Sequence, residues 1–387
     1  MYRINHKSSS ALAIISILLA SLMVFSFGCA KKEEKEIRIG ITLPLTGDAA
    51  IWGQSQKDGY DLALSQINVK GGINGKKLVL IYEDDKGLPK DGVAALQKLI
   101  NVDKIKLLTG IANSSVALAY IPIINEHKIL FISSGASSPK LTGASKYFFR
   151  TWPSDIAEAL AMAKYAHNEL KLNKIAILYI NNDYGIGLSE PFKSNFESLG
   201  GKIVNSENFE QGATDFRTQL TKIKASNPEA IYLAGNPVEM GRAVKQMREL
   251  GIRNQVLSIS TLNDKEVFKI AGAKAIEGTI ITDASFDPQS EDPMAKKFMQ
   301  DFRTMFNHEP GILANTAYDA LIIFAHAIEK VETDTDKLSD YLHAMKDYSG
   351  ISGKISFSDG GDVNRPIRIA GAKGGKFEKI FENYKWY

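Results

Sequence analysis

Short apolar runs with the composition of β-strands alternate with longer helix-period segments along most of the chain. After Glu36 the pattern begins with a strand at 37–43, a helix at 55–69 and a strand at 78–82. Tyr60, Ala63, Leu64 and Ile67 form one apolar stripe on that helix. Strands that alternate with helices favour parallel sheets covered on both faces. The sequence therefore predicts an α/β fold.

The same alternation starts again after Trp152-Pro153. The first series continues with a helix at 93–102, a strand at 105–108, a helix around 116–126 and a strand at 129–132. The second series has helices at 156–170, 188–199, 216–225 and 239–250, and strands at 175–180, 202–209, 230–233, 255–259 and 279–282. Open sheets rarely exceed about ten strands before they split. Two sheets in two lobes are therefore expected.

The C-terminal part has a different order. Helices are expected at 294–306, 312–328 and 338–345, followed by strands at 354–357 and 367–369. This order indicates that the chain returns to complete both lobes. We expect lobe 1 to comprise residues 37–153 plus 284–348, and lobe 2 residues 154–283 plus 349–387.

The N-terminus has the order of a secretory signal. Arg3 and Lys7 precede an uncharged apolar run from Ala11 to Phe27, which is followed by small residues and a charged segment. We expect residues 1–28 to be a signal peptide. A permanent transmembrane anchor is the alternative, since the run is at the lower length limit for spanning a bilayer.

Cys29 is the only cysteine of the chain, so no internal disulfide can form. Its position after the apolar run resembles the lipobox of bacterial lipoproteins, in which the cysteine is lipidated. Gly28 fits that pattern, whereas Ser26 and Phe27 depart from it. We expect Cys29 to anchor the protein in a membrane and residues 29–36 to form a solvated tether; a cysteine buried in a membrane segment is the alternative.

Motifs for catalysis, cofactors or metals are weak or missing in the sequence. Gly185-Ile186-Gly187 lacks the third glycine of a dinucleotide-binding fingerprint, because position 190 is a glutamate. The six histidines show no metal-ligand spacing, and no Gly-x-Ser-x-Gly motif occurs. The net charge of +3 gives no electrostatic reason to expect nucleic acid. We expect no cofactor, metal, nucleic acid or enzymatic activity, although catalytic groups from distant segments can converge.

Polar clusters follow three expected strands. They are Thr46-Gly47-Asp48 through Trp52, Asn113-Ser114-Ser115, and the run 133–138. Ligands of open α/β sheets bind beyond the carboxyl ends of the strands, and amides at a helix start bind anions. N-capping and turn formation are the alternative roles. Two such clusters on neighbouring strands favour a shared anion site.

The chain also resembles a known family. Leu43-Pro44-Leu45-Thr46-Gly47, the segment from Gly71 to Lys76, Asp183-Tyr184-Gly185, Glu239-Met240-Gly241 and Ala317-Tyr318-Asp319-Ala320 are similar to motifs of type I periplasmic binding proteins, in the leucine/isoleucine/valine-binding branch that serves ABC importers. The resemblance covers about residues 37–370. It implies two Rossmann-like lobes with parallel sheets, joined by a three-crossing hinge that closes on a ligand.

The resemblance also implies ligand-binding residues. Those matching Ser114, Gly135 and Ser137 would hold the α-carboxylate and part of the ammonium of a ligand. Trp52 would cover its apolar part, and Tyr184 would reach it from the second lobe. Ala136, Asn236 and Ser260 are also expected to belong to the binding site.

The sequence departs from the family at two positions. Amino-acid binders place a glutamate opposite the ligand ammonium, where this chain has Ser260, and an aromatic pair is replaced by Asn236-Pro237. A buried ammonium without an anionic partner is costly. Either another acid such as Asp183 substitutes, or the ligand is an aromatic or aliphatic carboxylate rather than an ordinary amino acid.

The expected function is delivery of an amino acid or small carboxylate to the permease and ATPase of an ABC importer, from a lipid-anchored position in the periplasm or at the cell surface. A sensor of the same fold that reports to a signalling partner is the alternative. A transcription regulator is less favoured because an export signal stands where a DNA-binding module would be required.

Overall fold

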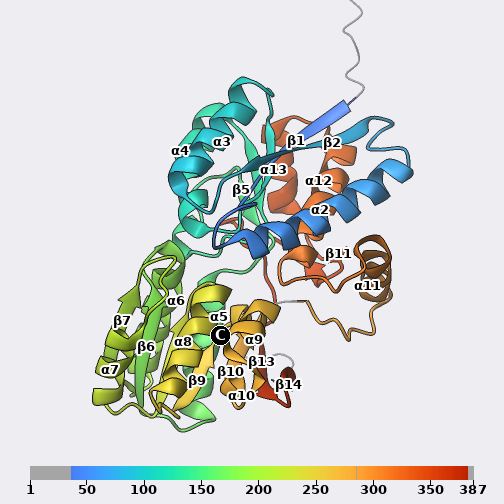
Figure 1. Cartoon of the computed structure of the whole chain (residues 1–387). Helices are drawn as coiled ribbons and strands as arrows, with labels where there is room; N and C mark the ends of the chain where they lie inside the picture. The colour runs from blue at the N-terminus through green and yellow to red at the C-terminus, as the bar shows by residue number, and fades with distance from the viewer. Residues whose placement is uncertain (1–35, 285, 382–387) are drawn as a thin grey trace, which may run out of the picture.

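The computed structural model describes residues 36–284 and 286–381. They form two lobes, each built around one β-sheet, with helices on both faces of each sheet (Figure 1). The α/β class and the two-lobed arrangement expected from the sequence are confirmed. The expectations for residues 1–35, including the signal peptide and Cys29, lie outside the described residues.

The first lobe contains a parallel sheet in the order β2-β1-β3-β4-β5. Its strands are β1 (Glu36–Leu43), β2 (Lys77–Asp84), β3 (Leu107–Gly110), β4 (Leu130–Ser133) and β5 (Phe148–Arg150). Apolar side chains of α2 (Ala50–Val69), α12 (Ala314–Val331) and α13 (Thr335–Ala344) pack on one face. Those of α3 (Pro89–Asn101) and α4 (Ser114–His127) pack on the other. Both faces of the sheet are covered by helices and excluded from solvent, which explains the continuous apolar runs of these strands.

The second lobe contains a mixed sheet in the order β14-β13-β10-β9-β8-β6-β7. Its strands are β6 (Lys174–Ile180), β7 (Lys202–Phe209), β8 (Ala230–Ala234), β9 (Gln255–Ser258), β10 (Ile280–Asp283), β13 (Arg368–Lys373) and β14 (Lys376–Phe381). Helices α5 (Asp155–Asn168) and α6 (Asp183–Ser198) cover one face. Helices α7 (Arg217–Ala225), α8 (Pro237–Glu249), α9 (Lys265–Ala271) and α10 (Ala273–Ile276) cover the other. Strands β13 and β14 run antiparallel to their neighbours. A fully parallel sheet was expected, so this sheet differs from the expectation at one edge.

The last crossing between the lobes lies later than the expected boundary at residue 349. Strands β11 (Tyr348–Gly350) and β12 (Gly353–Ile355) form a hairpin, and Ile355, Phe357 and Val363 are buried in the core of the first lobe. Helix α11 (Pro293–Phe306) packs on α2 of the same lobe. The chain therefore stays in the first lobe through Val363 and enters the second sheet at β13.

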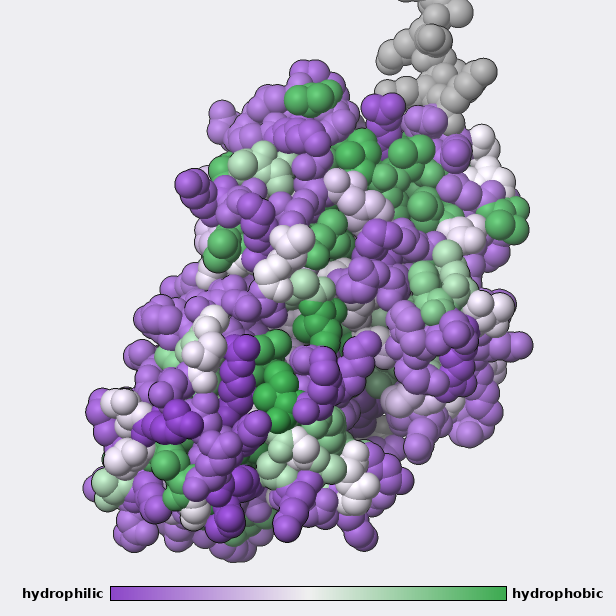
Figure 2. Space-filling model, viewed as in Figure 1, coloured by the Kyte–Doolittle hydropathy of each residue, from purple (hydrophilic) through white to green (hydrophobic). Residues whose placement is uncertain are grey.

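The carboxyl ends of both sets of parallel strands point to the junction of the lobes, since the loops after β1, β3 and β4 meet those after β6, β7 and β9 in one cleft. In Figure 2, green hydrophobic side chains are visible between the lobes, and another group lies over the upper lobe. The junction is the position where open α/β sheets place their ligands.

Candidate ligand-binding cleft

A cleft lies between the two lobes. Its empty volume is about 770 Å³, including space open to solvent. The first lobe and the hinge contribute Trp52, Gly87, Pro89, Ala112, Asn113, Ser114, Ser115, Gly135, Ser137, Trp152, Ile312 and Leu313. The second lobe contributes Asn182, Tyr184, Gln211 and Thr261. The lining thus combines apolar walls with a few hydroxyl and amide groups, as in many small-molecule sites.

The N-terminus of α4 supplies hydrogen-bond donors on the first-lobe side. No side chain caps this helix, so its first amides are available to an external acceptor. The Ser114 Oγ accepts hydrogen bonds from the amides of Ser137 and Ser138, at 3.1 and 3.0 Å. Because the Ser114 oxygen already accepts two hydrogen bonds, its hydroxyl is available to a ligand as a donor. Helix amides and a donating hydroxyl together suit a carboxylate.

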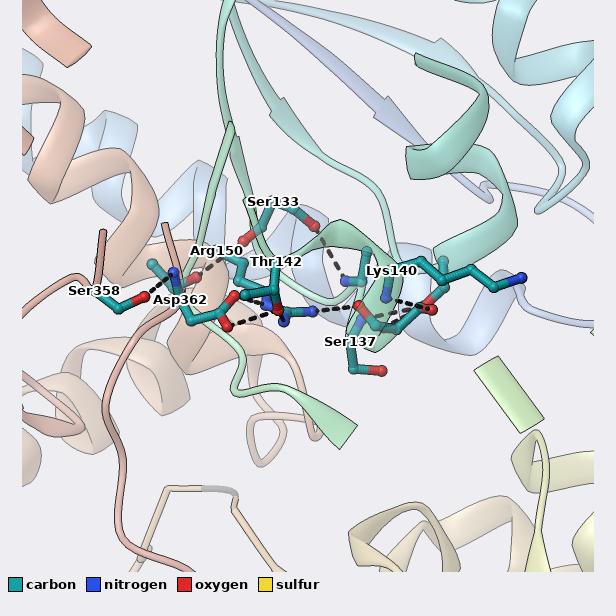
Figure 3. A network of polar contacts seen from close by, with 11 residues as sticks. Ser133, Ser137, Lys140, Thr142, Arg150, Ser358 and Asp362 are labelled. Atoms are coloured by element: carbon teal, nitrogen blue, oxygen red, sulfur yellow. Dashed lines mark hydrogen bonds and ion pairs between the residues drawn. The ribbon is translucent and has the colours of Figure 1, made fainter. Parts of the chain in front are cut away.

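A buried arginine holds the loop 133–138 in place (Figure 3). The Arg150 guanidinium donates to the Ser138 carbonyl at 2.9 Å and to Thr142 Oγ1 at 2.9 Å, and it pairs with Asp362 at 2.7 Å. Figure 3 shows the Ser137 side chain pointing away from this network. The Ser137 hydroxyl is therefore free of these structural contacts and lines the cleft.

Aromatic side chains enclose the apolar part of the cleft. Trp52 from α2 and Tyr184 from α6 meet edge to face, with ring centroids 6.0 Å apart, across the junction of the lobes. The Tyr184 hydroxyl bonds the Thr261 hydroxyl at 2.9 Å. Burial raises the pKa of Tyr184 well above its ordinary value, so this hydroxyl stays neutral. Trp152, which follows β5, completes the apolar cluster at the hinge.

The lobes touch at one edge of the cleft. Lys140 of the first lobe pairs with Asp183 of the second at 2.8 Å, and the Asp183 amide donates to Ser115 Oγ at 3.4 Å. Asp183 is thus engaged by a lysine, and it does not line the cleft. Asp183 is therefore not placed to substitute for the glutamate that the family resemblance implies where this chain has Ser260.

The structure brings most of the predicted site residues together. Trp52, Ser114, Gly135, Ser137 and Tyr184 line the cleft. The other three predicted residues, Ala136, Asn236 and Ser260, are buried and do not line it. Ala136 packs in the first-lobe core, Asn236 begins α8, and Ser260 donates to the Glu158 carboxylate at 3.2 Å.

Gly135 has a local packing reason. A Cβ at this position would lie 3.0 Å from both Ala112 Cα and Leu313 Cδ1. A side chain at position 135 would therefore push the loop away from Ala112 and Leu313, which line the same side of the cleft.

Several lining residues were missed at the level of sequence. Asn182, Gln211 and Thr261 follow strands β6, β7 and β9, so the strand-end rule alone could have found them. Trp152, Ile312 and Leu313 lie in connecting segments, where no sequence pattern marks them.

The described part of the chain contains neither a candidate metal site nor a helix suited to span a membrane. Within residues 36–284 and 286–381, no cluster of three or more His, Cys, Asp or Glu side chains is suited to hold a metal ion. In the same part of the chain, no helix combines the length and apolarity needed to cross a bilayer.

Two facing α/β lobes, with an uncapped helix start and an aromatic wall in the cleft between them, have the architecture of a two-lobed solute-binding protein. The family model described as periplasmic binding protein matches residues 36–376. The chain therefore belongs to the periplasmic binding proteins, which are extracytoplasmic solute-binding proteins and not enzymes. The family expected from the sequence is confirmed.

Relatives and solved structures agree with this assignment. A Leu/Ile/Val-binding protein homologue of Brucella melitensis is 30% identical over 355 residues, which are 91% of this chain and 95% of the relative. A leucine-binding protein from Thermotoga maritima has a TM-score of 0.85 and 26% identity, covering 90% of this chain and 99% of its own. A branched-chain amino acid binding protein of Streptococcus pneumoniae, solved with isoleucine, has a TM-score of 0.82 and 27% identity, covering 90% of this chain and 100% of its own.

Proposed function

We propose that this chain captures a branched-chain or other amino acid, or a related small carboxylate, and delivers it to the permease and ATPase of an ABC importer. The observation that carries the proposal is the start of α4, where uncapped amides and the Ser114 hydroxyl face a cleft walled by Trp52 and Tyr184. One relative is named as a Leu/Ile/Val-binding protein homologue, and two similar solved structures are named as binding proteins for leucine or branched-chain amino acids. These names support this ligand class.

Each predicted residue has a role in the proposed complex. Ser114, Gly135 and Ser137 form the cradle of the carboxylate, with Ala136 shaping the loop. Trp52 covers the apolar part of the ligand and Tyr184 closes over it from the second lobe. Asn236 and Ser260 belong to the layer behind the second-lobe wall.

A thermal-shift panel of amino acids, aromatic acids and aliphatic carboxylates tests the proposal, because a ligand specific to the folded state raises the melting temperature. We expect the hits to share a carboxylate. Ser114→Ala should weaken them about tenfold, as expected for the loss of a hydrogen bond to a charged group. Ser65→Ala, at an exposed position of α2, is the matched control and should bind normally. Hits without an anionic group would contradict the proposed carboxylate site.

We also propose that the protein is lipidated on Cys29 and held at a membrane by residues 29–36. The position of Cys29 after the apolar run supports this anchor. Cys29→Ser should move the protein from the membrane fraction to the soluble fraction and abolish incorporation of labelled palmitate. A variant that stays in the membrane fraction would favour an uncleaved transmembrane segment instead.

A further inference from the structure

Two buried carboxyl groups lie on the first turn of α5, directly behind the residues that line the cleft. Asp155 and Glu158 are three residues apart, which places them on one face of the helix. They are only 1% and 2% exposed. The Asp155 amide donates to the Ser137 carbonyl at 2.9 Å, so Asp155 adjoins the loop assigned to the ligand carboxylate. Acids are rarely this buried without a partner.

Glu158 lies against the residue that marks the departure from amino-acid binders. Its Oε1 accepts hydrogen bonds from Ser260 Oγ at 3.2 Å and from Thr282 Oγ1 at 3.3 Å. Ser260 stands where the family resemblance places a glutamate, and the next residue, Thr261, lines the cleft. The carboxyl group lost from position 260 is therefore supplied within hydrogen-bond distance by a different helix.

Neither Asp155 carboxylate oxygen accepts a hydrogen bond of normal geometry among the described residues. The Ser137 hydroxyl is the group near enough to lower the pKa of Asp155 by hydrogen bonding. Its Oδ2 would lie 3.0 Å from a Cβ added at Gly187, which shows that it faces α6. Tyr184, on that same helix, lines the cleft, and the pKa of its hydroxyl is raised further by the charges of Asp155 and Glu158. Leaving a buried carboxylate unpaired is strongly unfavourable, so this group is suited to receive a donor from outside the protein.

The charged side chains that act on Asp155 and Glu158 each have other partners. Arg150, whose charge acts on Asp155, donates to Ser138, Thr142 and Asp362. Asp283, whose charge acts on Glu158, pairs with Arg368 at 2.9 Å. The acid pair therefore lacks a cationic partner of its own among the contacts of the described residues.

Burial and mutual repulsion change how the pair titrates. Burial is the largest cause that raises the pKa of Asp155 to about 7. Burial, then the charges of Asp155 and Asp283, raise the pKa of Glu158 to about 8, against the hydroxyls of Ser260 and Thr282. The phenols of Tyr184 and Tyr232 face the same pair and stay neutral. An incoming cation would stabilise both carboxylates and release protons.

We propose that Asp155 and Glu158 bind the ammonium group of the ligand in place of the glutamate absent at position 260, so that the cleft selects α-amino acids over carboxylates that lack an amine. This inference rests on the proposed function, because it takes the ligand carboxylate to lie at Ser114 and Ser137. Ser137 adjoins both subsites, as required for two groups carried on one carbon atom.

The test compares matched ligands by isothermal titration calorimetry on the purified protein. The pairs are leucine with 4-methylpentanoate, phenylalanine with 3-phenylpropanoate, and alanine with propanoate. Wild-type protein should bind at least one amino acid about 10- to 100-fold more tightly than its amine-free partner, as expected for a hydrogen bond between charged groups. Glu158→Gln and Asp155→Asn should remove most of this preference and leave binding of the amine-free acid unchanged.

Two further variants act as controls. Glu169→Gln changes an exposed acid at the end of the same helix and should leave the preference intact. Asp183→Asn removes the rival acid at the edge of the cleft, and it should weaken both members of a pair equally. A preference that disappears only in Asp183→Asn would overturn the proposal.

Proton release provides an independent readout. At pH 7 amino-acid binding should release protons, so the observed enthalpy should depend on the ionisation enthalpy of the buffer. Either acid variant should reduce this dependence. Equal affinity for both members of every pair, or a buffer-independent enthalpy, would overturn the inference while leaving the carboxylate site intact. No binding of any member would contradict the proposed function itself.

Discussion

Glu158 is the residue whose environment most directly links function to stability. Its carboxyl group is 2% exposed and has a pKa raised from 4.5 to about 8 by burial. The folded state therefore holds this proton more tightly than the unfolded state. Below pH 4.5 both states are protonated and the group has no effect. As the pH rises from 4.5 to 8, the folded state loses stability on account of this group.

Glu158→Gln removes the titrating group and keeps the side-chain shape. The free energy of unfolding of the ligand-free protein should rise at pH 8 by up to about 4 kcal/mol and stay nearly unchanged at pH 4. Urea denaturation at the two pH values measures this difference. The exposed control Glu169→Gln should show no such dependence, and an equal shift of Glu158→Gln at both pH values would contradict the raised pKa.

At the scale of residues, the sequence predicts the groups at strand ends and misses those on α5. Ser114 and Ser137 follow β3 and β4, so the general rule for open α/β sheets brings them to the cleft. Glu158 follows a hinge crossing rather than a strand. Its sequence position resembles that of an ordinary helix residue, and only the tertiary contact with Ser260 shows its place.

At the scale of secondary-structure elements, α6 packs closely against the opposite lobe. A Cβ at Gly187 would lie 2.7 Å from Cδ of Pro139, which begins the short helix η2 (Pro139–Leu141) of the first lobe. Gly187 therefore lets α6 pack against the first lobe when the cleft is closed.

Gly187→Ala should hinder closure while leaving the fold intact, since alanine is the better helix former. We expect affinity for every ligand to fall by about tenfold, which corresponds to about 1.4 kcal/mol of lost closure energy. Small-angle X-ray scattering at saturating ligand should show a larger radius of gyration than for wild type. Ser194→Ala, at an exposed position of α6, is the control. A normal affinity in Gly187→Ala would show that α6 does not limit closure.

The elements themselves are predicted well where burial imposes a clear period. Strands β1, β6 and β8 are apolar runs in dry sheets, and helix α12 carries a broad apolar face. Strand β14 was missed because most of its side chains are exposed, which removes the apolar signal. The hairpin β11–β12 was assigned to the wrong lobe, because a short strand carries no information about the core in which Ile355 is buried.

At the scale of the whole molecule, the two lobes meet through an apolar cluster that includes Trp52 and Tyr184 and through one ion pair at the edge of the cleft. The Lys140–Asp183 pair is partly exposed, with side-chain exposures of 62% and 28%, and surface pairs of this kind contribute little. We expect a ligand to stabilise closure only to the extent that it prefers the closed form.

The position of β1 also fits a tethered protein. Its carboxyl end leads into the cleft, so Glu36 begins at the opposite end of the first sheet (Figure 1). The proposed tether would therefore join the first lobe at the end remote from the cleft.

A crystal structure of the protein with the tightest ligand from the panel tests the proposed carboxylate site. We expect a ligand enclosed between the lobes, with its carboxylate within hydrogen-bond distance of the Ser114 hydroxyl and the first amides of α4. A ligand bound outside the cleft, or one with its carboxylate turned away from α4, would contradict it.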